Sequence, residues 1–217
     1  AMAARHRLAA SGVADPQVTL IEERGTILRD VGVSARLVLT RELGARGITL
    51  RNRARAVQVT AQAVVLADGT EVPAALTIGA ATARPQGWLA ETGLELVDGC
   101  IAVEETLRAR SDPAVYAVGD CAHLAADPRP KAGVYAVRAA PVLLNNIRAD
   151  LIGSTRKAFR PQQGYLKLIS LGAKEAVADR FGFAPKGAGI WAWKDRIDRD
   201  FMEQFRHLPY RDMRPKT

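Results

Sequence analysis

Apolar residues along the first part of the chain change their spacing from that of a helix to that of a strand and back. Residues 2–10 hold neither Gly nor Pro and are expected to form a helix, and residues 18–21 form a short, largely apolar run after a turn. Such a run predicts a strand inside a parallel sheet covered by helices. Residues 33–46 then space their apolar side chains as a helix does, and Gly47 is placed to end it before another strand.

The next segment has the alternation of short antiparallel strands. Residues 56–66 alternate apolar and polar positions, and Asp68-Gly69 predicts a tight turn into residues 70–73. We therefore expect a β-meander. A further buried strand is expected over residues 76–80. A short hairpin is expected next, with its turn at Asp98-Gly99 and a strand over residues 101–103.

The sharpest local pattern lies in the middle of the chain. Residues 112–118 read as a buried strand that ends on Gly119 and Asp120. Because glycine lacks the side chain that would block a ligand, a carboxylate directly after it is placed to accept hydrogen bonds from ligand hydroxyl groups.

An acid also ends the 18–21 strand, at Glu22, with Glu23 beside it. In a dinucleotide-binding βαβ unit, an acid at this place binds the adenosine ribose, and a GxGxxG turn about 20 residues earlier holds the pyrophosphate. No GxGxxG occurs in the 217 residues. We therefore expect the chain to open partway through such a unit. Solvated acids are also common at strand ends, so that interpretation stays open.

Composition narrows the classes of function. The chain has 31 Lys and Arg against 23 Asp and Glu, a net charge of +8, which favours an anionic partner. The bases lie in short mixed clusters without interleaved aromatic residues, which argues against nucleic acid. The longest uncharged, largely apolar run, residues 72–83 with Thr77 and Thr82 in it, is shorter than the roughly 18 residues of a membrane-spanning helix. The 2 cysteines and 3 histidines are too scattered for a zinc site, so we expect no metal and a reducing cytoplasm.

Three segments resemble the flavin-dependent pyridine nucleotide-disulfide oxidoreductase superfamily. IAVEETLRARSDPAVYAVGDCA (101–122) is similar to its second FAD motif, in which the aspartate, here Asp120, binds the ribitol of FAD. VTLIEERGTIL (18–28) is similar to the second strand of its NADH domain, which places Glu22 at the ribose. IGAATARP (78–85) is similar to the ATG motif that joins the two domains, with the residue order altered.

A fourth segment, PKAGVYAVRAAPVLLNNI (130–147), resembles the helix whose N-terminal amides face the flavin ring. Amides and the helix dipole stabilise the negative charge that gathers on the pyrimidine side of the ring when hydride arrives. The stretch also reads as an amphipathic core helix, and both interpretations hold together. The resemblance implies no catalytic acid or base. It implies these cofactor-binding residues: Glu22, Gly119, Asp120, Lys131, Ala132 and Gly133.

The expected cofactors are FAD and NAD(H). Because neither of the family's two nucleotide-binding glycine loops occurs in these residues, this chain by itself is expected to bind FAD weakly or not at all. An acid at Glu22 favours NADH, because it would repel the 2′-phosphate of NADPH. Arg24, two residues later, is placed to pair with that phosphate instead, so NADPH stays open as the second choice.

Within the superfamily, the chain is most similar to type II NADH dehydrogenases and to the flavoprotein module fused ahead of selenophosphate synthetase (selenide, water dikinase). YLKLISLGAKEAVADR (165–180) and WAWKDRIDRDFMEQF (191–205) resemble the end of that module. The resemblance implies hydride transfer from nicotinamide C4 to flavin N5 and then reduction of an acceptor such as a quinone. The alternative is a non-catalytic fragment or interaction module that works with a partner chain or with a selenophosphate synthetase domain.

The tail carries an apolar stripe at helical spacing, formed by Trp193, Ile197, Phe201 and Phe205. One interpretation is an anchor on the membrane surface, which would make a cytoplasmic protein peripheral on the inner membrane face. The other is a cover over the flavin domain or a homodimer partner, and the nearly balanced charges around the stripe favour it.

Together these observations predict an α/β fold: parts of two Rossmann-like dinucleotide-binding folds with a β-meander, plus an α+β cap. The predicted boundaries give an NAD(P)H-binding domain over residues 1–82, the returning part of an FAD-binding domain over residues 83–153, and a C-terminal cap with an amphipathic helix over residues 154–217.

Overall fold

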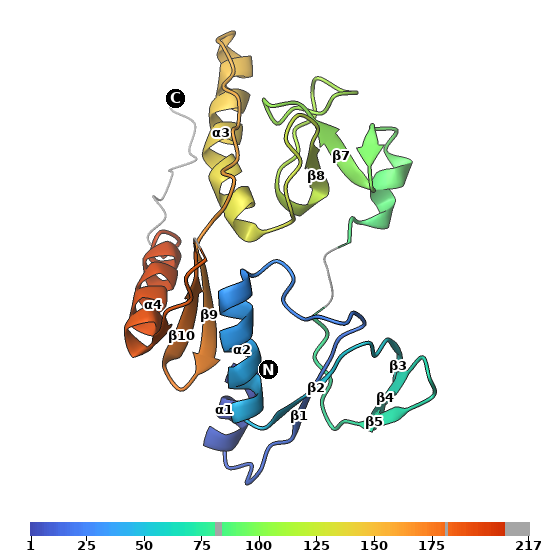
Figure 1. The fold of residues 1–217 in the computed structure, drawn as a ribbon. Coiled ribbons are helices and arrows are strands. Elements are labelled where there is room, and N and C mark those ends of the chain that lie inside the picture. Colours follow the sequence, from blue (N-terminus) through green and yellow to red (C-terminus); the bar gives the residue numbers. More distant parts are fainter. Residues whose placement is uncertain (81–83, 181, 207–217) are drawn as a thin grey trace, which may run out of the picture. The chain divides into compact units, whose positions relative to one another are not determined.

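The computed structural model describes residues 1–80, 84–180 and 182–206, which fold into two compact units (Figure 1). The first unit combines residues 1–77 with the described residues that follow position 165. The second unit contains residues 78–165. The domain boundaries drawn from the sequence at residues 82 and 153 follow motifs rather than contacts, and they stay a prediction.

The first unit opens with helix, strand, helix and strand, as predicted from the sequence. The two strands lie parallel, with Val18 opposite Ile48 and Ile21 opposite Arg51. A parallel pair joined by a helix is the elementary unit of an α/β fold. The bounds are α1 (Met2–Ala10), β1 (Val18–Ile21), α2 (Val33–Ala45) and β2 (Ile48–Arg51).

The apolar stripe predicted on the second helix packs into the core of the first unit. Ala35 and Leu39 are fully buried, Leu43 is nearly so, and Val38 packs against the same cluster. Gly47 follows the helix with a φ of 63°, the left-handed conformation that commonly ends a helix. Burial of this stripe, more than intrinsic helix propensity, stabilises α2.

The last part of the chain returns to the first unit as an antiparallel sheet and a helix. The sheet has the order β11-β10-β9. Leu171 and Val177 are buried in the same cluster as α2. The sheet lies close to α1, since a Cβ added at Gly172 would stand 3.0 Å from the Cβ of His6. The bounds are β9 (Lys167–Gly172), β10 (Glu175–Asp179), β11 (Lys186–Gly187) and α4 (Ala188–Glu203).

The predicted β-meander is confirmed as an antiparallel sheet of order β3-β4-β5. Buried and exposed positions do not alternate along these strands as the sequence predicts. Ala63, Val64 and Leu66 of the central strand are buried, whereas all four residues of β3 are exposed. The chain also turns at Thr60, whose hydroxyl donates to the Ala63 carbonyl at 3.1 Å. An edge strand pairs on one side and is free to be exposed. The bounds are β3 (Ala56–Val59), β4 (Ala63–Leu66) and β5 (Glu71–Pro73).

Residues 76–80 do not form the buried strand that the sequence predicts. Leu76 is 70% exposed and Ile78 is 69% exposed, and the stretch pairs with none of the described strands. The chain passes here from one compact unit to the other. Such a connection has no neighbouring strand with which to form a ladder. Residues 81–83 of the predicted ATG-like segment lie outside the described residues.

The second unit is built on a sheet of order β6-β7-β8 and one long helix. The predicted hairpin at Asp98-Gly99 is confirmed, with φ of 50° and 77° at the two turn residues, as a tight two-residue turn requires. Ile101 and Val103 of β7 form the core of this unit together with Leu89. The bounds are η1 (Gly87–Glu91), β6 (Leu96–Val97), β7 (Cys100–Val103), η2 (Gly119–Cys121), β8 (Ala122–Leu124) and α3 (Gly133–Ile152), where η denotes a short 3₁₀ helix.

The strand predicted over residues 112–118 is reduced to one β-bridge, between Arg108 and Tyr116. Backbone hydrogen bonds join this segment to residues 107–109. The two sides of β7 are already taken by β6 and β8, so the 112–118 segment has no free edge there. The parallel strand of this unit therefore begins after the Gly119–Asp120 turn instead of before it.

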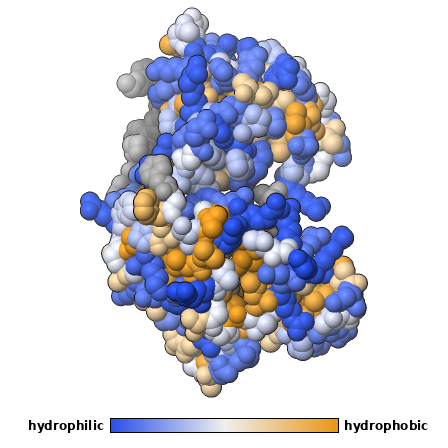
Figure 2. Space-filling model, viewed as in Figure 1, coloured by the Kyte–Doolittle hydropathy of each residue, from blue (hydrophilic) through white to orange (hydrophobic). Residues whose placement is uncertain are grey.

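Trp193, Ile197 and Phe201 of the tail's apolar stripe lie on α4, and Phe205 follows the end of the helix. All four side chains are exposed. Trp193 is 46% exposed and Ile197 is 43% exposed. Figure 2 shows that apolar side chains, in orange, also reach the surface on the face in view. Within the described ranges, no helix has the length and hydropathy of a membrane-crossing segment.

Candidate functional site

Gly119 and Asp120 form a tight turn that is held against the first turns of α3. Gly119 has a φ of 72°, and a Cβ added there would stand 3.3 Å from the Cβ of Ala136. Glycine suits this position because it adopts the left-handed conformation and leaves the space next to Ala136 free. Asp120 is exposed at the tip, and its carbonyl oxygen accepts a hydrogen bond from the thiol of Cys100 at 3.5 Å.

The N-terminus of α3 lies beside this turn and carries no side-chain cap. Its N-cap residue is Ala132, and its first turn has no acidic residue. The N–H of Tyr135 donates to the carbonyl of Ala132 at 3.0 Å. The N–H groups of Gly133 and Val134 keep their donor capacity, and the helix dipole makes this end partly positive. Lys131 precedes the helix, and its ammonium group donates to the carbonyl of Ala122.

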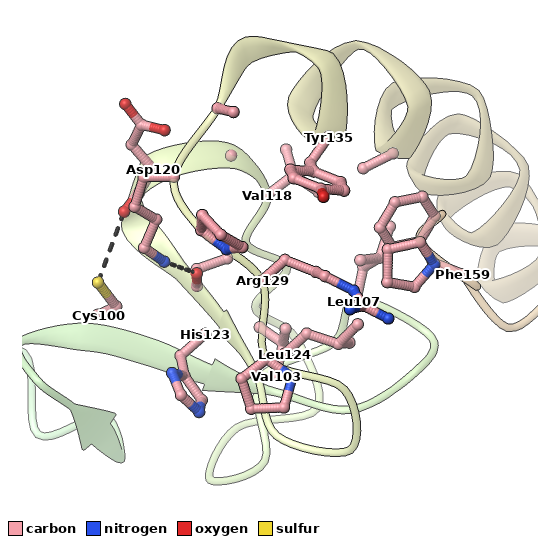
Figure 3. A pocket seen from close by; sticks show the side chains of 18 of the residues that line it. Cys100, Val103, Leu107, Val118, Asp120, His123, Leu124, Arg129, Tyr135 and Phe159 are labelled. Carbon is pink, nitrogen blue, oxygen red and sulfur yellow. Dashed lines mark hydrogen bonds between the residues drawn. The ribbon is translucent and has the colours of Figure 1, made fainter. Parts of the chain in front are cut away.

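A cavity of about 350 Å³ opens between these elements (Figure 3). Apolar side chains, including Val103 and Leu124, form much of its lining, and Tyr135 and Phe159 add aromatic rings. Figure 3 shows Asp120 at one end of the cavity and Arg129 with Phe159 toward the other. The cavity therefore combines a carboxylate acceptor, helix N–H donors and flat apolar walls.

Arg129 supplies a cation to the cavity lining. Its guanidinium pairs with Asp127 at 2.5 Å, while its Nε is buried and has no hydrogen-bond partner among the described residues. A buried donor without an acceptor costs about 1–3 kcal/mol. A ligand that offers an acceptor at this place would remove that cost.

Most of the site residues predicted in the second unit meet at this cavity. Gly119, Asp120, Lys131 and Ala132 line it, and Gly133 is the next residue of the helix start. The residue roles stay a prediction. What the structure adds is that a 3₁₀ turn, and not the predicted strand, presents Asp120.

Two lining residues have little or no sequence signal. Arg129 stands between Pro128 and Pro130, a rigid context that marks a turn but does not indicate a binding residue. Phe159 reaches the cavity because its N–H donates to the carbonyl of Glu105 at 2.7 Å, a long-range contact that periodicity does not reveal.

Glu22 lies in the first unit, directly after β1. Its carboxylate Oε1 accepts the N–H of Arg24 at 2.9 Å. The carboxylate thus stands at the carboxyl end of a parallel strand, where an α/β sheet binds nucleotides. It is not among the residues that line the cavity of the second unit.

The described ranges contain no group of three or more His, Cys, Asp or Glu side chains able to hold a metal ion. Cys100 is buried, Cys121 is exposed, and both are free thiols. The thiol of Cys121 donates to the carbonyl of Val118 at 3.3 Å, within the turn that holds Asp120.

A parallel strand pair followed by an acid, and a Gly-Asp turn that meets an uncapped helix, are features of a dinucleotide-binding flavoprotein. Residues 1–140 match the model of the pyridine nucleotide-disulphide oxidoreductase family, and the chain belongs to this family. FAD and NAD(P)H are the cofactors of the family, in agreement with the prediction from the sequence.

Known proteins match the chain over part of their length. Ferroptosis suppressor protein 1 of Xenopus tropicalis is 38% identical over 81 residues, which are 37% of this chain and 20% of that protein. The sulfide:quinone oxidoreductase of Aquifex aeolicus superposes with a TM-score of 0.73 at 17% identity, covering 94% of this chain and 54% of that one. NDH2 of Plasmodium falciparum, solved with NADH, has a TM-score of 0.67 at 13% identity, covering 87% and 58%.

These comparisons support the fold class that the sequence predicts, an α/β protein with Rossmann-like FAD- and NAD-binding parts. The chain spans about half the length of the two solved structures and about a fifth of the length of the curated relative.

The residues of the second unit fit a flavin. A ribitol chain offers hydroxyl donors for the Asp120 carboxylate, and the flavin ring offers carbonyl and nitrogen acceptors for helix N–H groups. The unpartnered Nε of Arg129 is a further donor toward such a group. Apolar and aromatic walls suit a flat ring, and the cavity volume lies in the range of cofactor sites.

Proposed function

We propose that this chain is part of an FAD-dependent NAD(P)H oxidoreductase that delivers electrons to a quinone-like acceptor. The observation that carries the proposal is the meeting of the Gly119–Asp120 turn and the uncapped start of α3 at one cavity, in a chain of this family. The names of two structural neighbours, one a sulfide:quinone oxidoreductase and one solved with NADH, support the choice of acceptor and donor class.

When bound, FAD supplies the ring that accepts hydride and passes electrons on. The residues of this chain would hold and polarise it. Asp120 would accept hydrogen bonds from the ribitol hydroxyls, and the N–H groups at the start of α3 would donate to the pyrimidine edge of the ring. The same N–H groups and the helix dipole favour negative charge at that edge.

Two features of the cavity would keep water away from a bound flavin and support its ring. The apolar lining from Val103 and Leu124 removes competing solvent, which strengthens each polar contact in the cavity. Tyr135, which is packed edge-to-face against Tyr165 with ring centroids 5.7 Å apart, keeps a defined orientation at the wall. In the first unit, Glu22 is the residue proposed to bind the adenosine ribose of the pyridine nucleotide.

The test is the visible absorption spectrum of the natural protein that contains these residues, recorded before and after adding NADH or NADPH without oxygen. A yellow protein that bleaches on adding either dinucleotide supports the proposal. A protein that takes up FAD without bleaching would contradict the hydride step, and a protein that takes up none would contradict the flavin site.

The contribution of Asp120 is tested in the same protein with Asp120→Asn. Loss of a charge-assisted hydrogen bond is expected to weaken FAD binding by about tenfold to a hundredfold, measured by titrating the apoprotein with FAD and following flavin fluorescence. Glu91→Gln is the matched control, because Glu91 is exposed on η1 and does not line the cavity. Equal losses in both variants would argue against a specific role for Asp120.

A second candidate function is an interaction module that keeps the fold without catalysis. The exposed stripe on α4, with Trp193 and Ile197, favours it, because apolar side chains on an amphipathic helix commonly meet a partner. Three partners are to be tested: the selenophosphate synthetase domain proposed from the sequence resemblance, a second copy of this chain, and the membrane surface. A cytoplasmic location, peripheral on the inner membrane face, is likewise a proposal. A colourless protein that co-purifies with such a partner would favour this function.

A further inference from the structure

The segments that follow β1 and β2 stay paired beyond the ends of the two strands. The N–H of Glu22 donates to the carbonyl of Arg51 at 2.9 Å, and the N–H of Ala54 donates to the carbonyl of Glu22 at 3.0 Å. The N–H of Arg53 then donates to the carbonyl of Arg24 at 3.0 Å. Arg24 and Arg53, distant in sequence, are thereby fixed beside each other at the carboxyl edge of a parallel pair, where α/β sheets bind nucleotides.

Arg53 is held in an unusual backbone conformation. Its φ is 54°, in the left-handed region that non-glycine residues seldom adopt and that concentrates at functional sites. Its guanidinium lies over Gly25, since a Cβ added at Gly25 would stand 3.3 Å from the Nε of Arg53. Gly25 therefore leaves room for this side chain next to the Glu22–Arg24 turn.

The charges at this edge do not cancel. Glu23 lies 3.7 Å from the Nε of Arg55, and one carboxylate oxygen of Glu22 accepts the N–H of Arg24. Neither Arg24 nor Arg53 forms an ion pair with any residue in the described part of the chain, and both are exposed. The guanidinium groups of Arg24 and Arg53 are thus available to bind an anion.

We propose that Arg24 and Arg53 bind the 2′-phosphate of NADPH, so that the protein accepts NADPH in addition to NADH. The inference rests on the proposed function, since it assigns the specificity of the same pyridine-nucleotide site. Guanidinium groups match a phosphate monoester in geometry as well as in charge. The repulsion expected from Glu22 is reduced because its carboxylate is turned onto the Arg24 amide. The sequence pointed to Arg24, and the tertiary structure adds Arg53.

The test compares two ligands that differ in the position of one phosphate, 2′,5′-ADP and 3′,5′-ADP, with 5′-AMP as the reference. Binding to the natural protein that contains these residues is measured by isothermal titration calorimetry. We expect 2′,5′-ADP to bind at least tenfold more tightly than 3′,5′-ADP. In the double variant Arg24→Gln/Arg53→Asn this advantage should fall to less than twofold, while 5′-AMP binds as before. Asparagine is chosen because it tolerates a positive φ.

The control variant is Arg196→Ser on α4, which removes a cation whose side chain is 81% exposed and should leave the preference for 2′,5′-ADP unchanged. The advantage should also shrink as ionic strength rises. A matching readout is the ratio of kcat/KM for NADPH over NADH, which should fall about tenfold or more in the double variant.

Equal binding of 2′,5′-ADP and 3′,5′-ADP would overturn this proposal while leaving the proposed function intact, provided that the flavin still bleaches with NADH. Binding of single-stranded RNA through the same two arginines, without a preference between the two ADP isomers, would overturn it in favour of nucleic acid. A protein that binds neither ADP isomer nor 5′-AMP would contradict the nucleotide site itself and therefore both proposals.

Discussion

The backbone N–H of Gly32 donates a hydrogen bond of 3.0 Å to the carboxylate of Asp179, across 147 residues of sequence. Gly32 directly precedes α2, and Asp179 ends β10. Asp179 is buried, and its carboxylate also lies 4.0 Å from the ammonium group of Lys167. This contact satisfies an N–H group at the start of α2 and ties the end of the chain to its beginning.

A side chain at residue 32 would destroy this contact. A Cβ added at Gly32 would stand 2.6 Å from Oδ1 of Asp179, closer than atoms can approach. Gly32→Ala is therefore expected to lower the free energy of unfolding by about 1–3 kcal/mol, measured by urea denaturation. Gly44 lies within α2, and a Cβ added there meets nothing within 4 Å. Gly44→Ala should therefore leave the free energy of unfolding unchanged or raise it. Equal effects of the two variants would contradict the packing described.

Glu42 makes the stability of the first unit depend on pH. The hydrogen bond from Lys186 is the main cause that lowers the pKa of this carboxyl group, and Arg46 lowers it further while burial opposes both. A lowered pKa in the folded state adds stability that is complete above the unfolded-state value of about 4.3 and is lost as pH falls through the folded-state pKa.

Glu42→Gln should therefore reduce the free energy of unfolding by about 1–2 kcal/mol at pH 7, because Lys186 loses its carboxylate partner and Arg46 is left with Glu175 alone. Near pH 3 the difference between wild type and variant should shrink. Urea denaturation at both pH values checks this. The exposed Glu71→Gln serves as control and should change little at either pH. A difference that grows toward acid pH would contradict the assigned direction of the pKa shift.

Asn146 holds the segment that carries Phe159 to the cavity. This fully buried side chain donates to the carbonyls of Thr106 and Lys157 and accepts the N–H of Lys157, each at 2.8 Å. Asn146→Ala leaves these backbone groups without partners and should cost about 2–4 kcal/mol of unfolding free energy. Asn145→Ala, on the exposed face of the same helix, should change it by less than about 0.5 kcal/mol. Thermal denaturation of the two variants and of the wild type measures these differences, and equal losses in both variants would contradict the role of Asn146.

Gly119→Ala separates backbone strain from close packing. Gly119 and Gly153 have φ of 72° and 69°, but an added Cβ meets Ala136 at 3.3 Å in the first case and nothing within 4 Å in the second. Alanine should destabilise by about 1 kcal/mol at Gly153 and by more at Gly119. Because the turn presents Asp120, the Gly119 variant should also bind FAD more weakly, whereas the Gly153 variant should not. Equal FAD affinity in both would contradict the role of the turn.

The sequence by itself determined the helix, strand, helix, strand order that opens the first unit, and the tight turn of the second unit's hairpin. The helical spacing of Leu39 and Leu43, the β-branched-rich strand that ends before Glu22, and the turn at Asp98-Gly99 all depend on neighbours within a few residues. Local periodicity and turn chemistry are enough to predict such features. The same local signals, together with the family resemblance, led to Asp120 and to the start of α3.

Tertiary structure decided what depends on distant neighbours. Residues 76–80 and 112–118 have the composition of strands, but a strand also needs a neighbouring strand to pair with. Among the described residues, 76–80 pair with no strand, and 112–118 form the one bridge of Tyr116 to Arg108, because β6 and β8 already occupy both sides of β7. Arg129 and Phe159 reach the cavity through turns and long-range hydrogen bonds, and Arg53 reaches Arg24 through the pairing of two strand ends. Contacts of this kind are fixed by chain topology, and composition and periodicity carry little information about them.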